Sequence, residues 1–244
     1  MSDYRVIHGD CLAVLPTLAA DLVVTSPPYN CGKHYGTADD SLAMRDYWEF
    51  TEAWFSAAAR ICSGYICANV PNWIGSRSER VFALDEYRAI FDRHAEFIDI
   101  AIWHKGPANG AAWGNRPNAP RLRANHEWVL IYRCGDGMAD NGLTWGDWSR
   151  LTETIWKIPA TLPFRNDHPA TFPVALPERC IRLYSQPGAV VLDPFCGTGT
   201  TGEAAVGVGR DFIGIEIDAQ HAHTAQKRLD CFTAQADLFA GISL

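Results

Sequence analysis

A polar, proline-rich hexapeptide directly follows a short apolar run near the N-terminus. The hexapeptide is Thr25-Ser26-Pro27-Pro28-Tyr29-Asn30, and the run before it is Leu22-Val23-Val24. The apolar run predicts a strand. The prolines predict a rigid loop, because proline fixes φ, has no N–H to donate and restricts the residue before it. The loop therefore presents fixed oxygen acceptors and one aromatic ring at the edge of a sheet.

This array suits methyl transfer to the exocyclic amine of a nucleobase. The lone pair of cytosine N4 or adenine N6 is delocalised into the ring, so the nitrogen is a poor nucleophile. The Ser26 hydroxyl and the Pro27 carbonyl can draw the amine hydrogens out of the ring plane and thereby localise the lone pair. Tyr29 can stack on a base that is flipped out of the duplex. The hexapeptide alone also fits an ordinary strand exit.

A second transition from strand to loop lies in the C-terminal part of the chain. Val190-Val191-Leu192 runs into Asp193-Pro194-Phe195-Cys196-Gly197-Thr198-Gly199, which opens a helix. The glycines let the backbone approach a nucleotide-like ligand closely. Glu216 lies at the tip of the next predicted strand, 17 residues beyond Gly199, close to the ~20 expected for an acid that binds ribose hydroxyls. The third glycine of a dinucleotide site is missing, which favours a smaller adenosine cofactor.

Together with four shorter motifs, these two loops carry a family resemblance. The chain resembles the permuted (β-class) S-adenosylmethionine-dependent DNA amino-methyltransferases of the N4-cytosine/N6-adenine type. The resemblance covers nearly the whole length, and the catalytic loop precedes the cofactor loop, as in the permuted group. The shorter motifs are Gly9-Asp10-Cys11, Ile102-Trp103-His104-Lys105, His126-Glu127-Trp128 and His168-Pro169-Ala170-Thr171-Phe172-Pro173.

The resemblance implies S-adenosylmethionine as the cofactor and double-stranded DNA as the substrate. It assigns catalysis to Thr25, Ser26, Pro27, Pro28 and Tyr29, with Asp10 near the target base. It assigns the methionine end of the cofactor site to Asp193, Phe195, Gly197, Thr198 and Gly199, and the ribose to Glu216. It also implies that the segment containing His168, Thr171 and Phe172 closes over the cofactor.

The order of elements predicts one α/β domain spanning residues 1–244. Strands alternate with helices, which indicates a doubly wound, mostly parallel, Rossmann-like sheet with the catalytic half first and the cofactor half last. Helices are expected at residues 11–18, 46–62, 80–94 and 177–184, and neighbouring strands at 96–104 and 127–133. The stretch 135–166 reads as irregular, and we expect it to be a small target-recognition region.

Composition excludes several other classes. A chain of 244 residues and 27.0 kDa with 48% hydrophobic residues supports one substantial domain. No apolar run approaches the ~18 residues of a membrane span, and the N-terminus lacks a secretory signal pattern, so we expect a cytoplasmic protein. The eight cysteines include no Cys-x-x-Cys pair, so neither a metal site nor a disulfide framework is expected. The absence of a Pro-Cys dipeptide argues against cytosine C5 methylation.

The net charge of −7 is unusual for a protein that binds many phosphates. Between Lys105 and Arg133, however, five basic residues stand against one acid, Glu127. Residues 106–125 are rich in Gly, Pro and Asn and are expected to form a basic loop that contacts DNA. The DNA-binding candidates are Lys105, Arg116, Arg121 and Arg123.

Three tryptophans stand in the region 135–166. We expect Trp156 to be packed in the core, whereas Trp145 and Trp148 fit either packing or recognition.

Several alternatives stay open at this stage. In the family, serine before Pro-Pro-Tyr goes mainly with cytosine N4 and an acid mainly with adenine N6, so Ser26 favours cytosine N4 and leaves adenine N6 as the alternative. A protein glutamine N-methyltransferase and a non-catalytic binding module are less favoured. A homodimer and a cognate restriction endonuclease acting on the same site are further partners to consider.

Overall fold

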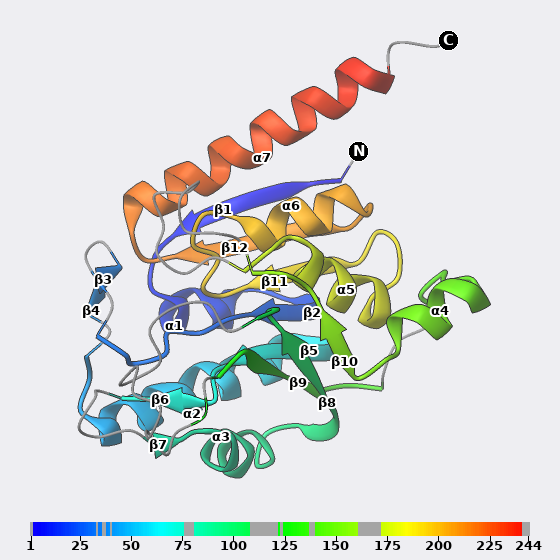
Figure 1. The fold of residues 1–244 in the computed structure, drawn as a ribbon. Coiled ribbons are helices and arrows are strands. Elements are labelled where there is room, and N and C mark those ends of the chain that lie inside the picture. Colours follow the sequence, from blue (N-terminus) through cyan, green and yellow to red (C-terminus); the bar gives the residue numbers. More distant parts are fainter. Residues whose placement is uncertain are drawn as a thin grey trace.

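The fold is built on one large β-sheet. The computed structural model describes residues 2–32, 34–35, 38–39, 41–75, 81–107, 122, 124–136, 140–160 and 172–240 (Figure 1). Eight strands pair in the order β1-β12-β11-β2-β5-β9-β8-β10. In that order they span Tyr4–His8, Asp211–Glu216, Val190–Asp193, Ala20–Thr25, Cys62–Val70, His126–Arg133, Glu96–His104 and Ile155–Lys157. Only β9 runs antiparallel to its neighbours in this sheet, which confirms the mostly parallel arrangement.

Helices cover both faces of the sheet, as Figure 1 shows. One face carries α1 (Cys11–Val14), a 3₁₀ turn (Leu15–Thr17), α2 (Met44–Ile61) and α3 (Leu84–Phe91), whose buried residues form one core cluster with the strands. The other face carries α5 (Ala175–Tyr184), α6 (Thr200–Gly207) and α7 (Ala219–Ala240), which contribute to a second cluster. The fold is therefore a three-layer, doubly wound α/β structure.

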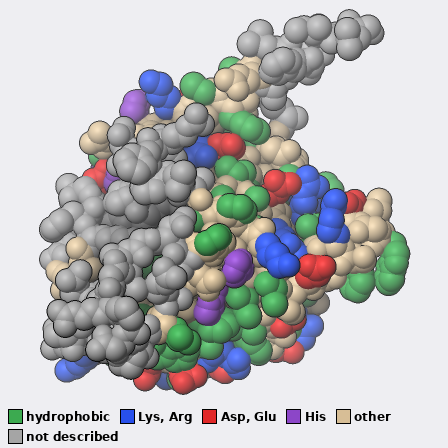
Figure 2. Space-filling model, viewed as in Figure 1, with side chains coloured by type: hydrophobic (Ala, Val, Ile, Leu, Met, Phe, Trp, Pro, Cys, Tyr) green, Lys and Arg blue, Asp and Glu red, His purple; other side chains and the backbone are tan. Residues whose placement is uncertain are grey.

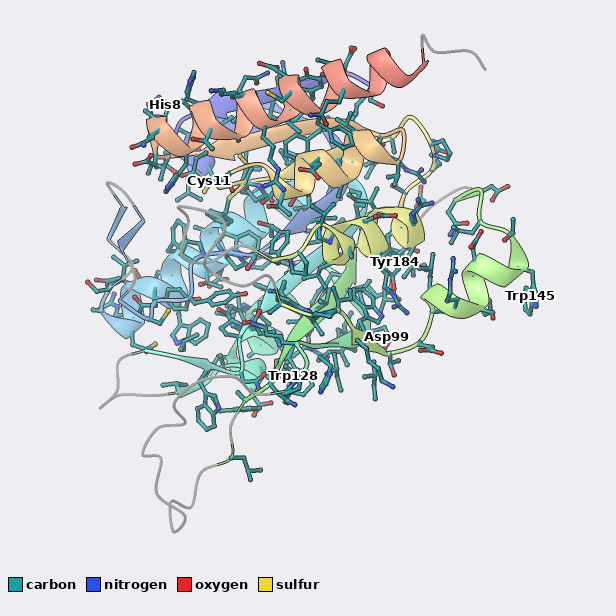
Figure 3. The ribbon with its side chains drawn as sticks, turned by 45° about the horizontal axis from the view of Figure 1, so that its top comes forward. His8, Cys11, Asp99, Trp128, Trp145 and Tyr184 are labelled. Atoms are coloured by element: carbon teal, nitrogen blue, oxygen red, sulfur yellow. The ribbon has the colours of Figure 1, made fainter. Side chains whose placement is uncertain are left out.

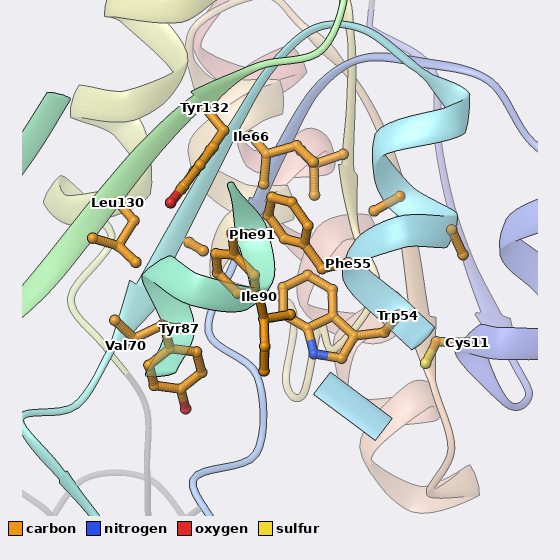
Figure 4. Close-up of a cluster of buried hydrophobic side chains, with 14 of the residues drawn as sticks. Cys11, Trp54, Phe55, Ile66, Val70, Tyr87, Ile90, Phe91, Leu130 and Tyr132 are labelled. Carbon is orange, nitrogen blue, oxygen red and sulfur yellow. The ribbon is translucent and has the colours of Figure 1, made fainter. Parts of the chain in front are cut away.

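Aromatic residues of α2 and α3 fill the first core cluster (Figure 4). Phe55 of α2 stacks on Phe91 of α3 with ring centroids 3.7 Å apart, and Trp54 packs edge-on against both rings. The helical spacing of apolar residues in α2 directs this face to the sheet. Because strand side chains alternate, β5 places Ile66 in this cluster and Cys67 in the other.

Two sequence predictions of local structure were wrong. The predicted helix 80–94 begins only at Leu84, because β7 (Val81–Phe82) pairs with β6 (Trp73–Ile74) in a hairpin. The stretch 135–166 contains α4 (Trp145–Leu151) and the edge strand β10. α4 is short but capped, because the Thr144 hydroxyl accepts a hydrogen bond from the Asp147 N–H. A further hairpin joins β3 (His34–Tyr35) and β4 (Ala38–Asp39).

The described surface is mixed in character. On the face in Figure 2, basic and acidic side chains are interspersed, and hydrophobic side chains gather at the end of the molecule where α4 lies. None of the described helices has the length and apolarity that crossing a membrane requires.

Candidate active site

The catalytic and cofactor loops leave the sheet side by side. Strands β2 and β11 are parallel neighbours, with Leu22 opposite Val191 and Val23 opposite Leu192. Their carboxyl ends therefore meet at one edge of the sheet, where open α/β sheets bind ligands. Two loops that lie far apart along the chain thus form one site.

A buried carboxylate joins the two loops. Asp193, at the end of β11, accepts hydrogen bonds from the Thr25 hydroxyl (2.7 Å), the Thr201 hydroxyl (2.6 Å) and the Phe195 N–H (3.0 Å). The side chain is buried, and this burial raises the pKa of Asp193 to about 6 despite the three donors. Asp193 thereby fixes the end of the catalytic strand relative to the start of α6.

The glycine loop is shaped for close approach. Gly197 and Gly199 have positive φ values of 52° and 83°, a conformation that residues with a Cβ atom rarely adopt. A Cβ added at Gly199 would lie 3.1 Å from the Cα of Ala225, so α7 also packs tightly here. The Glu216 carboxylate accepts hydrogen bonds from the N–H groups of Gly197 and Asp218, each at 2.9 Å. Carboxylate oxygens can accept further bonds, so this acid fits the ribose hydroxyls of an adenosine cofactor.

The catalytic loop is held from outside as well. The Tyr47 hydroxyl of α2 donates to the Pro28 carbonyl at 2.9 Å. Asn30 has a left-handed φ of 52°; its side-chain amide donates to the Leu42 carbonyl at 2.9 Å, and its own carbonyl accepts from the Gly75 N–H at 3.1 Å. These contacts fix the backbone that follows Ser26.

The hydroxyl of Tyr29 is the centre of a polar network. It lies 2.7 Å from the Ser26 Oγ and donates toward Glu127 Oε2 at 3.2 Å. The Asn69 amide donates both to the Tyr29 hydroxyl (2.7 Å) and to Glu127 Oε2 (2.8 Å). The Lys105 ammonium forms an ion pair with the other oxygen, Glu127 Oε1. At one end of this network, Ser26 belongs to the loop that is expected to receive the base.

The sheet topology assembles this network. Asn69 lies near the carboxyl end of β5 and Lys105 directly follows the end of β8, whereas Glu127 lies near the start of β9. Because β9 is antiparallel to β5 and β8, its beginning lies at the edge where its neighbours end. Neither Asn69 nor Glu127 was assigned a role from the sequence, although Glu127 stands in the motif His126-Glu127-Trp128. The available signal was a polar side chain near the end of an otherwise apolar strand.

An apolar hollow adjoins the same edge. Val24, Val129, Phe172 and Leu176 line it, together with Thr25 and Asn69 and the thiol-bearing Cys67 and Cys180. It lies between the sheet and α5. Phe172 thus shares this hollow with residues at the ends of β2 and β5. That its segment closes over the cofactor stays a prediction.

The comparisons with known proteins agree with this geometry. The model of the DNA methylase family N6_N4_Mtase matches residues 20–227. The chain belongs to this family. It is therefore an S-adenosylmethionine-dependent DNA methyltransferase of the N4/N6 amino-methyltransferase type.

Relatives and solved structures extend the match over most of the methylase. The type II methyltransferase M.ScaI of Streptomyces caespitosus is 30% identical over 260 residues, covering 94% of this chain and 82% of that protein. M.HpaI of Haemophilus parainfluenzae, also a type II methyltransferase, is 27% identical, covering 93% and 74%. The S-adenosylmethionine complex of TTHA0409 from Thermus thermophilus has a TM-score of 0.73 at 27% identity, with 94% of each chain covered. The cytosine-N4-specific PvuII methyltransferase shares the fold, with a TM-score of 0.75 at 19% identity over 93% of this chain and 86% of that chain.

Asp10 lies apart from the catalytic loop of the methylase. It follows β1 and caps α1, because its carboxylate accepts from the Leu12 N–H at 2.9 Å. Strands β12 and β11 stand between β1 and β2, a separation of roughly 14 Å at the usual strand spacing. Figure 3 shows its neighbours His8 and Cys11 far from Trp128, which adjoins Glu127. The structure therefore groups Asp10 with the Glu216 side of the site.

The predicted DNA-binding residues divide into two sets. Lys105 is engaged by Glu127 and lies over the Trp103 ring at 4.4 Å. The remaining candidates lie outside the described residues, as do two of the residues predicted to close over the cofactor. These are Arg116, Arg121, Arg123, His168 and Thr171.

The tryptophans of the region 135–166 have different environments. Trp156 is 2% exposed, which confirms that it packs in the core. Trp145 and Trp148 are 78% and 43% exposed and stack on each other with centroids 4.9 Å apart. They belong to α4, which precedes β10, a strand parallel to β8. α4 and its tryptophan pair therefore lie at the edge of the sheet opposite the catalytic loop (Figures 1 and 3).

Proposed function

We propose that this methylase modifies N4 of cytosine in double-stranded DNA. The observation that carries the proposal is the neutral hydroxyl of Ser26 at the position where an acid would favour adenine N6. Its Oγ is hydrogen-bonded to Tyr29 within a loop whose backbone carbonyls are bound at Pro28 and Asn30.

The residues of the two loops would divide the work. S-adenosylmethionine supplies an electrophilic methyl group on a sulfonium centre. Ser26 Oγ and the Pro27 carbonyl would accept the two amine hydrogens of the base and localise the nitrogen lone pair. Tyr29 would stack on the flipped cytosine.

The cofactor would be held on the side of Asp193 that faces away from the catalytic loop. Glu216 would bind the ribose hydroxyls, and the backbone from Phe195 to Gly199 would lie against the methionine end. Asp193, through its bonds to Thr25 and Thr201, would keep the base and the methyl donor in register. Methyl transfer needs reacting atoms about 3–3.5 Å apart, so this fixed register matters for the rate.

Adenine N6 is the second candidate base. The network around Tyr29 contains a carboxylate, Glu127, one hydroxyl removed from Ser26. An acid that acts at the amine through this hydroxyl would also suit the larger base. Because the chain resembles type II methyltransferases, we further propose that a cognate restriction endonuclease acts on the same site.

Labelled-methyl transfer tests the reaction and the roles of the loop. With methyl-labelled S-adenosylmethionine and PCR-amplified bacterial DNA, which carries no modification, the wild-type protein should label DNA and not added protein. Tyr29→Ala should lower the single-turnover rate by about tenfold or more, since one base–aromatic stack contributes ~1–3 kcal/mol. Ser26→Ala should also lower it, while Ser63→Ala, at an exposed position near the start of β5, serves as the matched control.

The outcomes separate the alternatives. Wild-type rates in both Ser26→Ala and Tyr29→Ala would sink the assignment of the catalytic loop. Label in protein and none in DNA would sink the proposed substrate. Methylome sequencing of a host that expresses the chain would then give the recognition sequence.

A further inference from the structure

The network around Tyr29 links Ser26 to a charged group that is not part of the catalytic loop. We propose that Glu127 is a positioning residue, which acts on Ser26 through the Tyr29 hydroxyl and takes up the proton that the methylated amine releases. The proposal rests on the proposed function, because it concerns the amine-binding role of Ser26. It goes beyond that function by adding a proton path on strand β9.

The donors and acceptors around the Tyr29 hydroxyl determine the direction of the path. The Asn69 amide donates to the Tyr29 hydroxyl at 2.7 Å, so this oxygen acts there as an acceptor. Tyr29 has a single hydroxyl hydrogen, whose candidate acceptors include Glu127 Oε2 at 3.2 Å and the Asn69 backbone carbonyl at 3.3 Å. The carboxylate is the stronger acceptor because it is charged. Ser26, 2.7 Å from Tyr29, then donates its own hydrogen to the Tyr29 oxygen.

This direction prepares Ser26 for the base. A serine whose hydrogen is committed to Tyr29 presents only lone pairs to an incoming amine. It therefore acts as an acceptor at the amine. Without the carboxylate, the Ser26 hydroxyl is free to turn its hydrogen toward the nucleophilic nitrogen, where it would compete for the lone pair that must attack the methyl group.

Two features around Glu127 support a dedicated role. The carboxylate is 14% exposed and is neutralised by the Lys105 ammonium, so a charge is kept beside the catalytic loop although removing it from water is costly. The Asn69 Oδ1 is buried and has no hydrogen-bond partner among the described residues. Rotating the amide would place this oxygen against the Glu127 carboxylate. The unpaired Oδ1 is thus a cost of pointing the amide hydrogens at Tyr29 and Glu127.

The chemical step balances along this path. The amine nitrogen forms a bond to the methyl carbon while the bond from that carbon to sulfur breaks, and sulfur keeps the electron pair. The nitrogen, now positively charged, releases one proton to Ser26 Oγ. The Ser26 hydrogen moves to the Tyr29 oxygen, and the Tyr29 hydrogen moves to Glu127 Oε2. Glu127 then loses the proton to solvent.

Two isosteric variants interrupt the path at different points. Tyr29→Phe keeps the ring for stacking and removes the linking hydroxyl. Glu127→Gln keeps an oxygen acceptor for Tyr29 and removes the charge, and the partly exposed Lys105 can turn to solvent. Tyr4→Phe, whose hydroxyl bonds Asp230 and Thr233 on α7, and Glu178→Gln, from a surface ion pair with Arg182, are the matched controls.

The test measures single-turnover methylation of PCR-amplified bacterial DNA, with the affinity for S-adenosylmethionine and for DNA measured separately. We expect Tyr29→Phe and Glu127→Gln each to slow the reaction by about a hundredfold with both affinities near wild type. We expect the double variant to be no slower than the slower single variant, because both residues act in series. The two control variants should react at the wild-type rate.

Three outcomes would overturn the proposal. If Glu127→Gln reacts within about threefold of wild type, the network only orients the tyrosine ring. If the two effects multiply, Glu127 does not act through Tyr29. If Glu127→Gln fails to fold, as judged by its melting curve, the rate of Tyr29→Phe decides alone, and a near-wild-type value overturns the path. A wild-type protein that labels no DNA would instead refute the proposed function itself.

Discussion

Two carboxylates, Asp193 and Glu127, lie at the same edge of the sheet but differ in burial and in their hydrogen-bond partners. Asp193 is 1% exposed and is bound by the neutral donors of Thr25, Thr201 and the Phe195 N–H. Glu127 is partly exposed and pairs with the Lys105 ammonium. One carboxylate is enclosed between two loops, and the other borders the space that the base would enter.

This difference in environment gives the two carboxylates different roles: Asp193 fixes the geometry of the loops, and Glu127 takes part in proton transfer. A buried carboxylate with neutral donors is costly to ionise, and the raised pKa of Asp193 reflects this burial. Its contribution is a fixed geometry. A carboxylate that is charge-compensated and connected to Ser26 by hydroxyl groups can exchange a proton during each turnover. Variants at the first residue should therefore change stability and cofactor binding, and variants at the second should change the rate.

The largest effect is expected from Asp193→Ala. The substitution leaves the Thr25 and Thr201 hydroxyls and the Phe195 N–H without their acceptor in the core, which should lower the free energy of unfolding by roughly 3 kcal/mol. Urea denaturation measures this change, with Asp147→Ala on the exposed α4 as the control. Equal denaturation midpoints for wild type and Asp193→Ala would show that Asp193 does not hold the loops together.

The pH dependence of stability tests the same carboxylate. The pKa of Asp193 is raised from 3.8 to about 6 by burial, so between these values the folded chain binds more protons than the unfolded chain. The stability that comes from protonating Asp193 is therefore fully present below about pH 4 and is lost as pH rises through 6, a change of about 3 kcal/mol. The free energy of unfolding of wild type minus that of Asp193→Asn should therefore fall as pH rises across this window, because asparagine does not titrate. A pH-independent difference would contradict the raised pKa.

Cofactor affinity should respond to Glu216. Glu216→Ala removes a charged acceptor for the ribose and also frees the Gly197 N–H that it holds. The loss should be roughly 1.5–3 kcal/mol, or about tenfold to more than a hundredfold in the affinity for S-adenosylmethionine by calorimetry. Gly199→Val should weaken binding as well, since its side chain would meet Ala225. Unchanged affinity in a folded Glu216→Ala protein would remove this residue from the cofactor site.

The salt dependence of DNA binding should separate the basic residues. Each lost phosphate contact reduces the slope of log affinity against log salt by about 0.9, so Arg121→Ala and Arg123→Ala should flatten it. Lys105→Met should leave the slope unchanged, because Lys105 is paired with Glu127. Trp145→Ala, at the opposite edge, should change neither slope nor affinity. A flatter slope in Lys105→Met and not in the arginine variants would reverse this assignment.

The sequence allowed the two loops to be predicted but not their surroundings. Both loops are continuous segments with strand, proline or glycine signals, so their location at the sheet edge followed from local chemistry. The prediction that residues 96–104 and 127–133 form neighbouring strands was correct. The pairing of β9 with β5, which brings Asn69 to Glu127 and Lys105, is specified by no local pattern. Asp10 illustrates the same limit, since only the strand order places it beside Glu216. The stacked tryptophan pair on α4 could not be predicted from the sequence either, because α4 is short and its place at the sheet edge depends on the pairing of β10 with β8.

The identity of the methylated base is the most direct test of the account. DNA treated with the wild-type protein and S-adenosylmethionine would be digested to nucleosides and separated by mass spectrometry. We predict N4-methylcytosine, formed at a site whose acceptor is the Ser26 hydroxyl. N6-methyladenine as the only product would contradict it, since serine before Pro-Pro-Tyr would then not specify cytosine in this protein.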